Sequence, residues 1–208
     1  MKADGGAAAR AYFTEFSRVL ERVEITTRHG KSLPTDEGIA SVIELIVTLK
    51  YHGGKLLLIG NGGSAAIVSH MHNDLCKTVG VRAIVFNEAP LLTALANDDG
   101  YHQVFHQPVQ LWADRHDVLI SVSSGGESEN IVRAATLAIE KGCQVVTFTG
   151  FKPTNRLRQI GDLNVYVPAS TYGHVETAHS VIAHCVTDIA GRAAAASVSN
   201  SIPILDVE

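Results

Sequence analysis

Short, almost continuous apolar runs recur along the chain from residue 55 onward. They are rich in Val, Leu and Ile, and stretches with helical spacing separate them. Runs of this length are typical of strands buried on both faces, as in a parallel sheet that helices cover on each side. The sequence therefore predicts an α/β fold, a three-layer α/β/α sandwich with a five-stranded parallel sheet, with strands within 55–60, 83–86, 117–122, 144–149 and 163–167.

The two ends of the chain carry helical patterns instead. Residues 7–28 and 36–52 place apolar side chains at steps of three and four, which predicts two N-terminal helices. Residues 174–197 predict a last helix. A length of 208 residues suits one core. We expect a single domain over 1–208, with N-terminal helices in 1–52, the α/β/α core in 53–198 and a tail in 199–208.

Composition and charge narrow the classes of function. Hydrophobic residues make up 46% and charged residues 18%, and no apolar run approaches the ~20 residues of a membrane span. The net charge is −4 and the Lys and Arg residues are scattered, which argues against nucleic acid as a ligand. Three cysteines without CxxC spacing, behind an N-terminus that does not resemble a signal peptide, indicate a cytoplasmic protein.

Two Gly/Ser-rich turns follow predicted strands. They are GNGGS at 60–64 and SSGGES at 123–128. Ligands of open α/β sheets bind at the carboxyl ends of the strands, where glycines allow close backbone approach and hydroxyls and helix N-termini attract anions. Neither turn matches a nucleotide-binding motif. One such turn is weak evidence, but two in one sheet predict a site for a small phosphorylated ligand.

Histidines and carboxylates form a second candidate site. His70 and Asp74 lie four residues apart on a predicted helix, and Glu176 and His184 lie eight apart on the last one. These four residues could bind Zn²⁺ or another divalent ion. The alternative is that each histidine is a hydrogen-bonded core or interface residue, which is the commoner case for a lone His and the one we expect for His72, His102, His106, His116 and His179.

The order of motifs resembles that of a known family. The motifs are GNGGS with the His and carboxylate behind it, ANDDGY at 96–101, SVSSGGES at 121–128, VVTFTG at 145–150 and ETAHSVIAHCVTD at 176–188. From about Leu20 to Ile189 the chain is similar to the phosphoheptose isomerases, also called sedoheptulose-7-phosphate isomerases, of the SIS (sugar isomerase) domain superfamily. The resemblance implies a homotetramer with active sites at subunit interfaces. It also implies conversion of sedoheptulose 7-phosphate to D-glycero-D-manno-heptose 7-phosphate, an early step of heptose biosynthesis in carbohydrate metabolism.

The resemblance also implies roles for individual residues. Asp74, His184 and Glu176 fall on acid/base positions, and His70, Asp74, Glu176 and His184 on metal positions. The residues that fall on substrate-binding positions are Asn61, Gly62, Ser64, Asp98, Ser123, Ser124 and Ser128.

The chain departs from the family at several of these positions. It has Asp74 where the family usually has Glu, and Glu176 where it usually has Gln. Either carboxylate could therefore be the base, since Asp74 is one methylene shorter. Gly125 and Glu127 alter the phosphate turn, and Gly173-His174 replaces an Asp-Arg pair. These changes leave open an isomerase for another sugar phosphate, or a non-catalytic SIS-domain protein that associates with the replication initiator.

Overall fold

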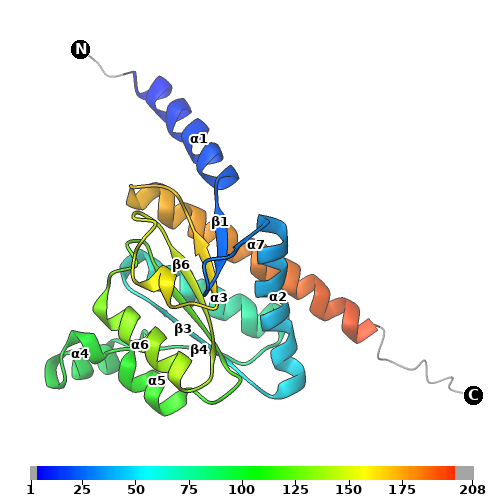
Figure 1. Cartoon of the computed structure of the whole chain (residues 1–208), viewed down its shortest axis with the longest axis vertical. Coiled ribbons are helices and arrows are strands. Elements are labelled where there is room, and N and C mark those ends of the chain that lie inside the picture. The colour runs from blue at the N-terminus through cyan, green and yellow to red at the C-terminus, as the bar shows by residue number, and fades with distance from the viewer. Residues whose placement is uncertain (1–3, 200–208) are drawn as a thin grey trace, which may run out of the picture.

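The structure is a computed structural model that describes residues 4–199, and it is built around one sheet (Figure 1). Seven strands pair in the order β2-β1-β7-β6-β5-β3-β4. The strands β3 to β7 are parallel to one another, which confirms the predicted five-stranded core. The bounds of the strands are β1 Glu24–Thr27, β2 Ser32–Leu33, β3 Leu56–Gly60, β4 Ala83–Val85, β5 Val118–Ser123, β6 Gln144–Thr149 and β7 Leu163–Tyr166.

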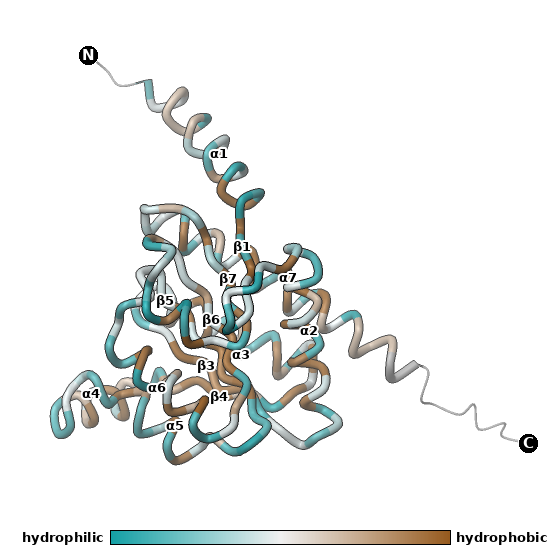
Figure 2. Tube along the Cα trace, viewed as in Figure 1, coloured by the Kyte–Doolittle hydropathy of each residue, from teal (hydrophilic) through white to brown (hydrophobic). Residues whose placement is uncertain are grey.

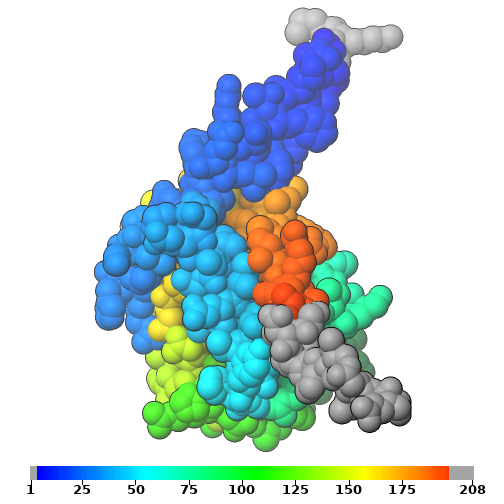
Figure 3. Space-filling view, turned by 90° about the vertical axis from the view of Figure 1, so that its right-hand side faces the viewer, coloured from blue at the N-terminus to red at the C-terminus, as the bar shows by residue number. Residues whose placement is uncertain are grey.

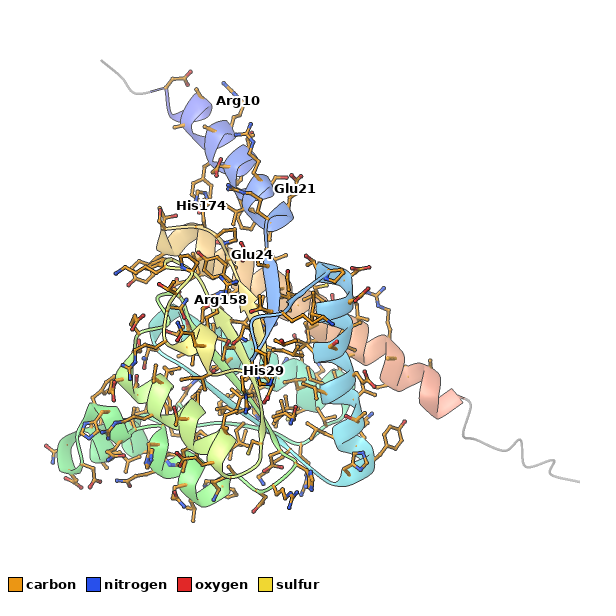
Figure 4. All side chains as sticks on the ribbon, in the orientation of Figure 1. Arg10, Glu21, Glu24, His29, Arg158 and His174 are labelled. Carbon is orange, nitrogen blue, oxygen red and sulfur yellow. The ribbon has the colours of Figure 1, made fainter. Side chains whose placement is uncertain are left out.

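Strands β1 and β2 are an addition that the hydrophobic pattern did not predict. The helical spacing predicts a first helix that reaches residue 28, but α1 ends at Glu21 and β1 pairs antiparallel with β7. The side chain of Ile25 is fully buried at this pairing. Arg158 reinforces the pairing through an ion pair with Glu24, Nη2 to Oε2 2.7 Å (Figure 4). The long-range contact with β7 therefore outweighs the local helical spacing.

Helices cover both faces of the sheet. Alternate residues of β3 point to opposite faces: Leu56 and Leu58 pack with α2, α3 and α7, while Leu57 and Ile59 pack with α5 and α6. All four are fully buried, which explains the continuous apolar run that Figure 2 shows along the sheet. The helices are α1 Gly5–Glu21, α2 Thr35–His52, α3 Gly62–Asp74, α4 Ala89–Asp98, α5 His106–Trp112, α6 Glu129–Glu140 and α7 Tyr172–Ser199; the shorter helical segments are Leu75–Val79, Tyr101–Gln103 and Leu157–Gln159.

The first helix stands apart from these layers. In both Figure 1 and Figure 3 α1 projects away from the body, and Val19 is its one buried residue. Its aromatic side chains Tyr12 and Phe13 are exposed. At the other end, α7 extends slightly beyond its predicted bounds, and residues 200–208 of the predicted tail lie outside the described part of the chain. Within residues 4–199, no helix combines the length and the apolar character that crossing a bilayer requires.

Candidate active site

A cavity of about 570 Å³ opens where β3, β5 and β6 end. Because these strands are parallel, the turns that follow them meet at one edge of the sheet. Five of the predicted substrate-binding residues line the cavity: Asn61, Ser64, Ser123, Ser124 and Ser128. The two Gly/Ser-rich turns thus line one pocket, although about 60 residues separate them in the sequence.

The hydroxyl groups of this pocket are placed to receive an anion. Ser123 and Ser124 are both more than 90% buried, and the hydroxyl of Ser124 has no hydrogen-bond partner among the described residues. Ser128 stands at the N-terminus of α6 without capping it through its side chain. Buried hydroxyls are rarely left unpaired, and the N-termini of α3 and α6 carry partial positive charge. A phosphate group fits this environment.

Glycines make the first turn possible. A Cβ on Gly60 would lie 2.8 Å from the backbone carbonyl group of Ser64, so any side chain there would force the turn apart. Gly62, another predicted substrate-binding residue, adopts a positive φ of 52° at the start of α3. This local geometry places Ser64 in the first turn of α3, directly after β3, where its side chain is buried.

Asn61 is held by two residues, Asn130 and Tyr101, that the sequence alone does not mark as part of the site. Its amide exchanges hydrogen bonds with Asn130, Nδ2 to Oδ1 at 3.0 Å and 2.9 Å, and its Oδ1 accepts a third from the hydroxyl of Tyr101 at 2.9 Å. Tyr101 closes the ANDDGY motif, which was the available signal for it. Asp98, from the same motif, is exposed and does not line the cavity; its Oδ1 accepts a hydrogen bond from Asn97.

The helices α3 and α7 bring His70, Asp74 and His184 together. Asp74 Oδ2 lies 3.4 Å from His70 Nε2 and 3.8 Å from His184 Nδ1, and one ligand atom from each of the three residues falls within 4.8 Å of the others. Ligands about 2.1 Å from a tetrahedral Zn²⁺ lie about 3.4 Å from one another. Two imidazole nitrogens and a carboxylate oxygen at these separations could hold a metal ion after a small closing movement.

Glu176 lies elsewhere on the same helix. It lines the cavity, and its carboxylate occupies the space beside Gly63, where a Cβ would lie 2.6 Å from Oε2. The eight residues that separate it from His184 correspond to a rise of about 12 Å along α7. The structure therefore brings three of the four predicted ligands together and places Glu176 at the hydroxyl-lined cavity.

His179, on the buried side of α7, belongs to the core as expected. Its side chain is fully buried beside Phe148, and Nε2 lies 3.1 Å from the carbonyl oxygen of Thr149. Burial lowers the pKa of His179 from 6.5 to about 4, so the ring is neutral at physiological pH. The side chain of His179 is thus part of the core, whereas His70 and His184 are exposed.

Comparisons with known proteins agree with this geometry. A family model described as "SIS domain" matches residues 11–150. The phosphoheptose isomerase of Geobacter sulfurreducens is 34% identical over 157 residues, which cover 73% of this chain and 82% of that protein. The phosphoheptose isomerase of Syntrophotalea carbinolica is 31% identical over 189 residues, which cover 88% of this chain and 91% of that protein. The structure of the phosphoheptose isomerase from Neisseria gonorrhoeae superposes with a TM-score of 0.78 at 25% identity, covering 90% of this chain and 98% of that one.

The matched segment, the fold and the paired turns define a SIS-domain protein. Within that class, the chain belongs to the phosphoheptose isomerase family. The resemblance seen in the sequence motifs is confirmed.

Proposed function

We propose that the chain is an aldose–ketose isomerase that converts sedoheptulose 7-phosphate to D-glycero-D-manno-heptose 7-phosphate in heptose biosynthesis. The observation that carries this proposal is the pairing of a hydroxyl-lined cavity with acid/base groups on the same two helices. Glu176 borders the cavity, and His70, Asp74 and His184 lie further along α3 and α7. Similar proteins are named phosphoheptose isomerases, which supports a heptose phosphate as the substrate.

The phosphate binds in the Gly/Ser-rich pocket. The hydroxyls of Ser64, Ser123, Ser124 and Ser128 donate to its oxygens, and the N-termini of α3 and α6 stabilise its charge. Asn61, fixed by Asn130 and Tyr101, is oriented toward the sugar hydroxyls. Anchoring one end of the sugar in this way positions its carbonyl end for proton transfer.

Isomerisation moves a proton between the two carbons at the carbonyl end. A base removes the proton from C1 of the ketose, an enediolate forms, and the proton returns to C2 while O1 loses its proton and O2 gains one. We assign the base to Glu176, because it borders the cavity and no described residue donates a hydrogen bond to its carboxylate. Asp74, by contrast, faces both imidazoles and accepts a hydrogen bond from Thr187 at 3.4 Å.

His184 supplies the acid, and together with His70 and Asp74 it would hold the metal. Its Nδ1 faces Asp74, which leaves Nε2 for proton transfer to the sugar oxygens. His70, Asp74 and His184 would hold a divalent ion, and mixed imidazole and carboxylate donors favour Zn²⁺. When bound, such an ion stabilises negative charge on nearby oxygens. We place C1 and C2 of the sugar between Glu176 and His184.

The assembly that we propose is a cytoplasmic homotetramer with active sites at subunit interfaces. Exposed aromatic side chains on the projecting α1 support burial against other subunits, and the exposed position of Asp98, outside the cavity of its own chain, supports a contact with a neighbouring site. Light scattering tests this directly. A mass near four times 22.2 kDa supports the tetramer, and a monomer at micromolar concentration contradicts it.

One observation favours a second candidate, an isomerase for another sugar phosphate. The ring of His174 stacks on Tyr12 with centroids 4.4 Å apart, and its Nδ1 lies 3.1 Å from the hydroxyl of Thr171, so the ring lies against α1 (Figure 4). A Cβ on Gly173 would meet the hydroxyl of Tyr12 at 2.8 Å. The family's Asp-Arg pair at these positions is therefore replaced by groups that pack against α1.

A panel of ketose and aldose phosphates, followed by NMR with zinc-loaded protein, tests the proposal. Turnover of sedoheptulose 7-phosphate supports it. Turnover of only a pentose or hexose phosphate supports the second candidate. Binding without turnover of any sugar phosphate contradicts both and favours the non-catalytic alternative.

A further inference from the structure

The turn after β6 holds a residue in an unfavourable backbone conformation at the edge of the cavity. Phe151 has a φ of 57°, in the left-handed region that glycine adopts freely and bulky residues seldom do. In the described part of the chain only one other non-glycine residue, His116, has a positive φ. His116 lies in the turn before β5, at the opposite edge of the sheet, and does not line the cavity. Strain of this kind persists only where surrounding contacts impose it.

Hydrogen bonds on both sides impose the conformation of Phe151. Its N–H donates to the carbonyl oxygen of Ala169 at 3.0 Å, and its carbonyl oxygen accepts from the hydroxyl of Tyr166 at 2.8 Å. The preceding residue is fixed as well, because the N–H of Gly150 donates to the carbonyl oxygen of Ser124 at 2.9 Å. The turn is therefore tied directly to the phosphate pocket.

The result of this conformation is an aromatic surface on the cavity. The ring of Phe151 packs edge-on against Tyr172, with centroids 4.9 Å apart and an interplanar angle of 72°, and both residues line the pocket. Tyr172 is 64% exposed, so its ring is not needed to fill the core. Phe151 also faces Gly125, where a Cβ would lie 3.8 Å from its ring. An apolar ring thus borders the position at which the family usually carries a serine.

We propose that Phe151 and Tyr172 form a specificity-determining wall that packs against the C–H groups of the substrate's carbon chain. The inference rests on the proposed binding of a phosphorylated sugar. The serines bind the phosphate, whereas the two rings bind the apolar face of the chain attached to it. Flat aromatic rings suit this role because they offer large, rigid contact surfaces. The wall therefore acts on sugar phosphates and leaves binding of inorganic phosphate unchanged.

The test compares two probes by calorimetry on the zinc-loaded protein. For Phe151→Asn and Tyr172→Ala we expect the dissociation constant for sedoheptulose 7-phosphate to rise about three- to tenfold, with that for inorganic phosphate unchanged. Asn is chosen because it tolerates a positive φ. Phe151→Tyr and Tyr172→Phe keep the rings and should bind as the unsubstituted protein does.

His116→Gly is the matched control, since it removes the other positive-φ side chain away from the cavity. It should change neither dissociation constant. The proposed wall is contradicted if Phe151→Asn raises the dissociation constants for sedoheptulose 7-phosphate and inorganic phosphate equally. It is also contradicted if Phe151→Asn and Tyr172→Ala leave the dissociation constant for sedoheptulose 7-phosphate unchanged. If the unsubstituted protein binds inorganic phosphate but no sugar phosphate, it is the proposed function that fails.

Discussion

Glu176→Gln is the substitution that separates the two candidate bases. Glutamine keeps the size of the side chain and its fit beside Gly63 but cannot accept a proton from carbon. It is also the residue that the family usually has at this position. If Asp74 were the base, the variant would resemble the relatives and retain activity.

The expected loss follows from the structure. Positioned general bases contribute about 10²- to 10⁴-fold to the rate, or about 3 to 5 kcal/mol of transition-state stabilisation. Asp74 cannot recover this easily, because its carboxylate is drawn back by roughly one bond length, about 1.5 Å, relative to Glu. Proton abstraction requires contact at about 2.6–3.2 Å. We therefore expect kcat of Glu176→Gln to fall by at least about 100-fold.

The assay measures kcat, KM and bound zinc for Glu176→Gln beside Asp74→Asn. We expect Glu176→Gln to lose turnover while it retains zinc and substrate binding, and Asp74→Asn to lose zinc. A Glu176→Gln variant with kcat within threefold of the unsubstituted protein would refute the assignment and return the base role to Asp74.

Three further predictions concern individual contacts. Gly63→Ala places a Cβ 2.6 Å from Oε2 of Glu176, so kcat should fall while the melting temperature stays constant or rises, as measured by kinetics and calorimetry. His70→Ala removes one of three ligands and should lose most of the bound zinc in metal analysis; full retention would contradict the cluster. Burial lowers the pKa of His179 from 6.5 to about 4, so the free energy of unfolding should be constant above pH 6.5 and decrease below it, by about 2 kcal/mol at about pH 5. Denaturant titrations should show a flatter dependence on pH in His179→Gln. The same pH dependence in both proteins would contradict this cause.

The sequence predicted the parallel sheet well because burial on both faces leaves a local signal. Each of the runs at 55–60, 117–122 and 144–149 has an apolar or β-branched residue at most steps, and each became a central strand. The strand β1 left no such signal, because only its pairing with β7 buries Ile25. Its residues continue the helical spacing of α1, and a local pattern cannot reveal a pairing partner that lies more than 130 residues further along the chain, such as Leu163 for Thr27.

The candidate site likewise has parts that the sequence predicted and parts that it did not. The serines of the two turns were predictable, since chain order places the ends of parallel strands at one edge. The position of Glu176 was not, because helical spacing tells which residues share a face of α7 but not which neighbour each one meets. Gly63 decides that question by leaving room for the carboxylate. The contacts of Asn61 with Asn130 and Tyr101 likewise depend on tertiary structure.

Isotope exchange shows whether the protein isomerises the sugar phosphate and whether Glu176 is the base. Zinc-loaded protein is incubated with sedoheptulose 7-phosphate in D₂O, and the products are followed by NMR. We expect an aldose heptose 7-phosphate that carries deuterium at C2, together with deuterium at C1 of the recovered ketose, and neither in Glu176→Gln. A complete absence of aldose and of deuterium at either carbon, with the substrate bound, would contradict it.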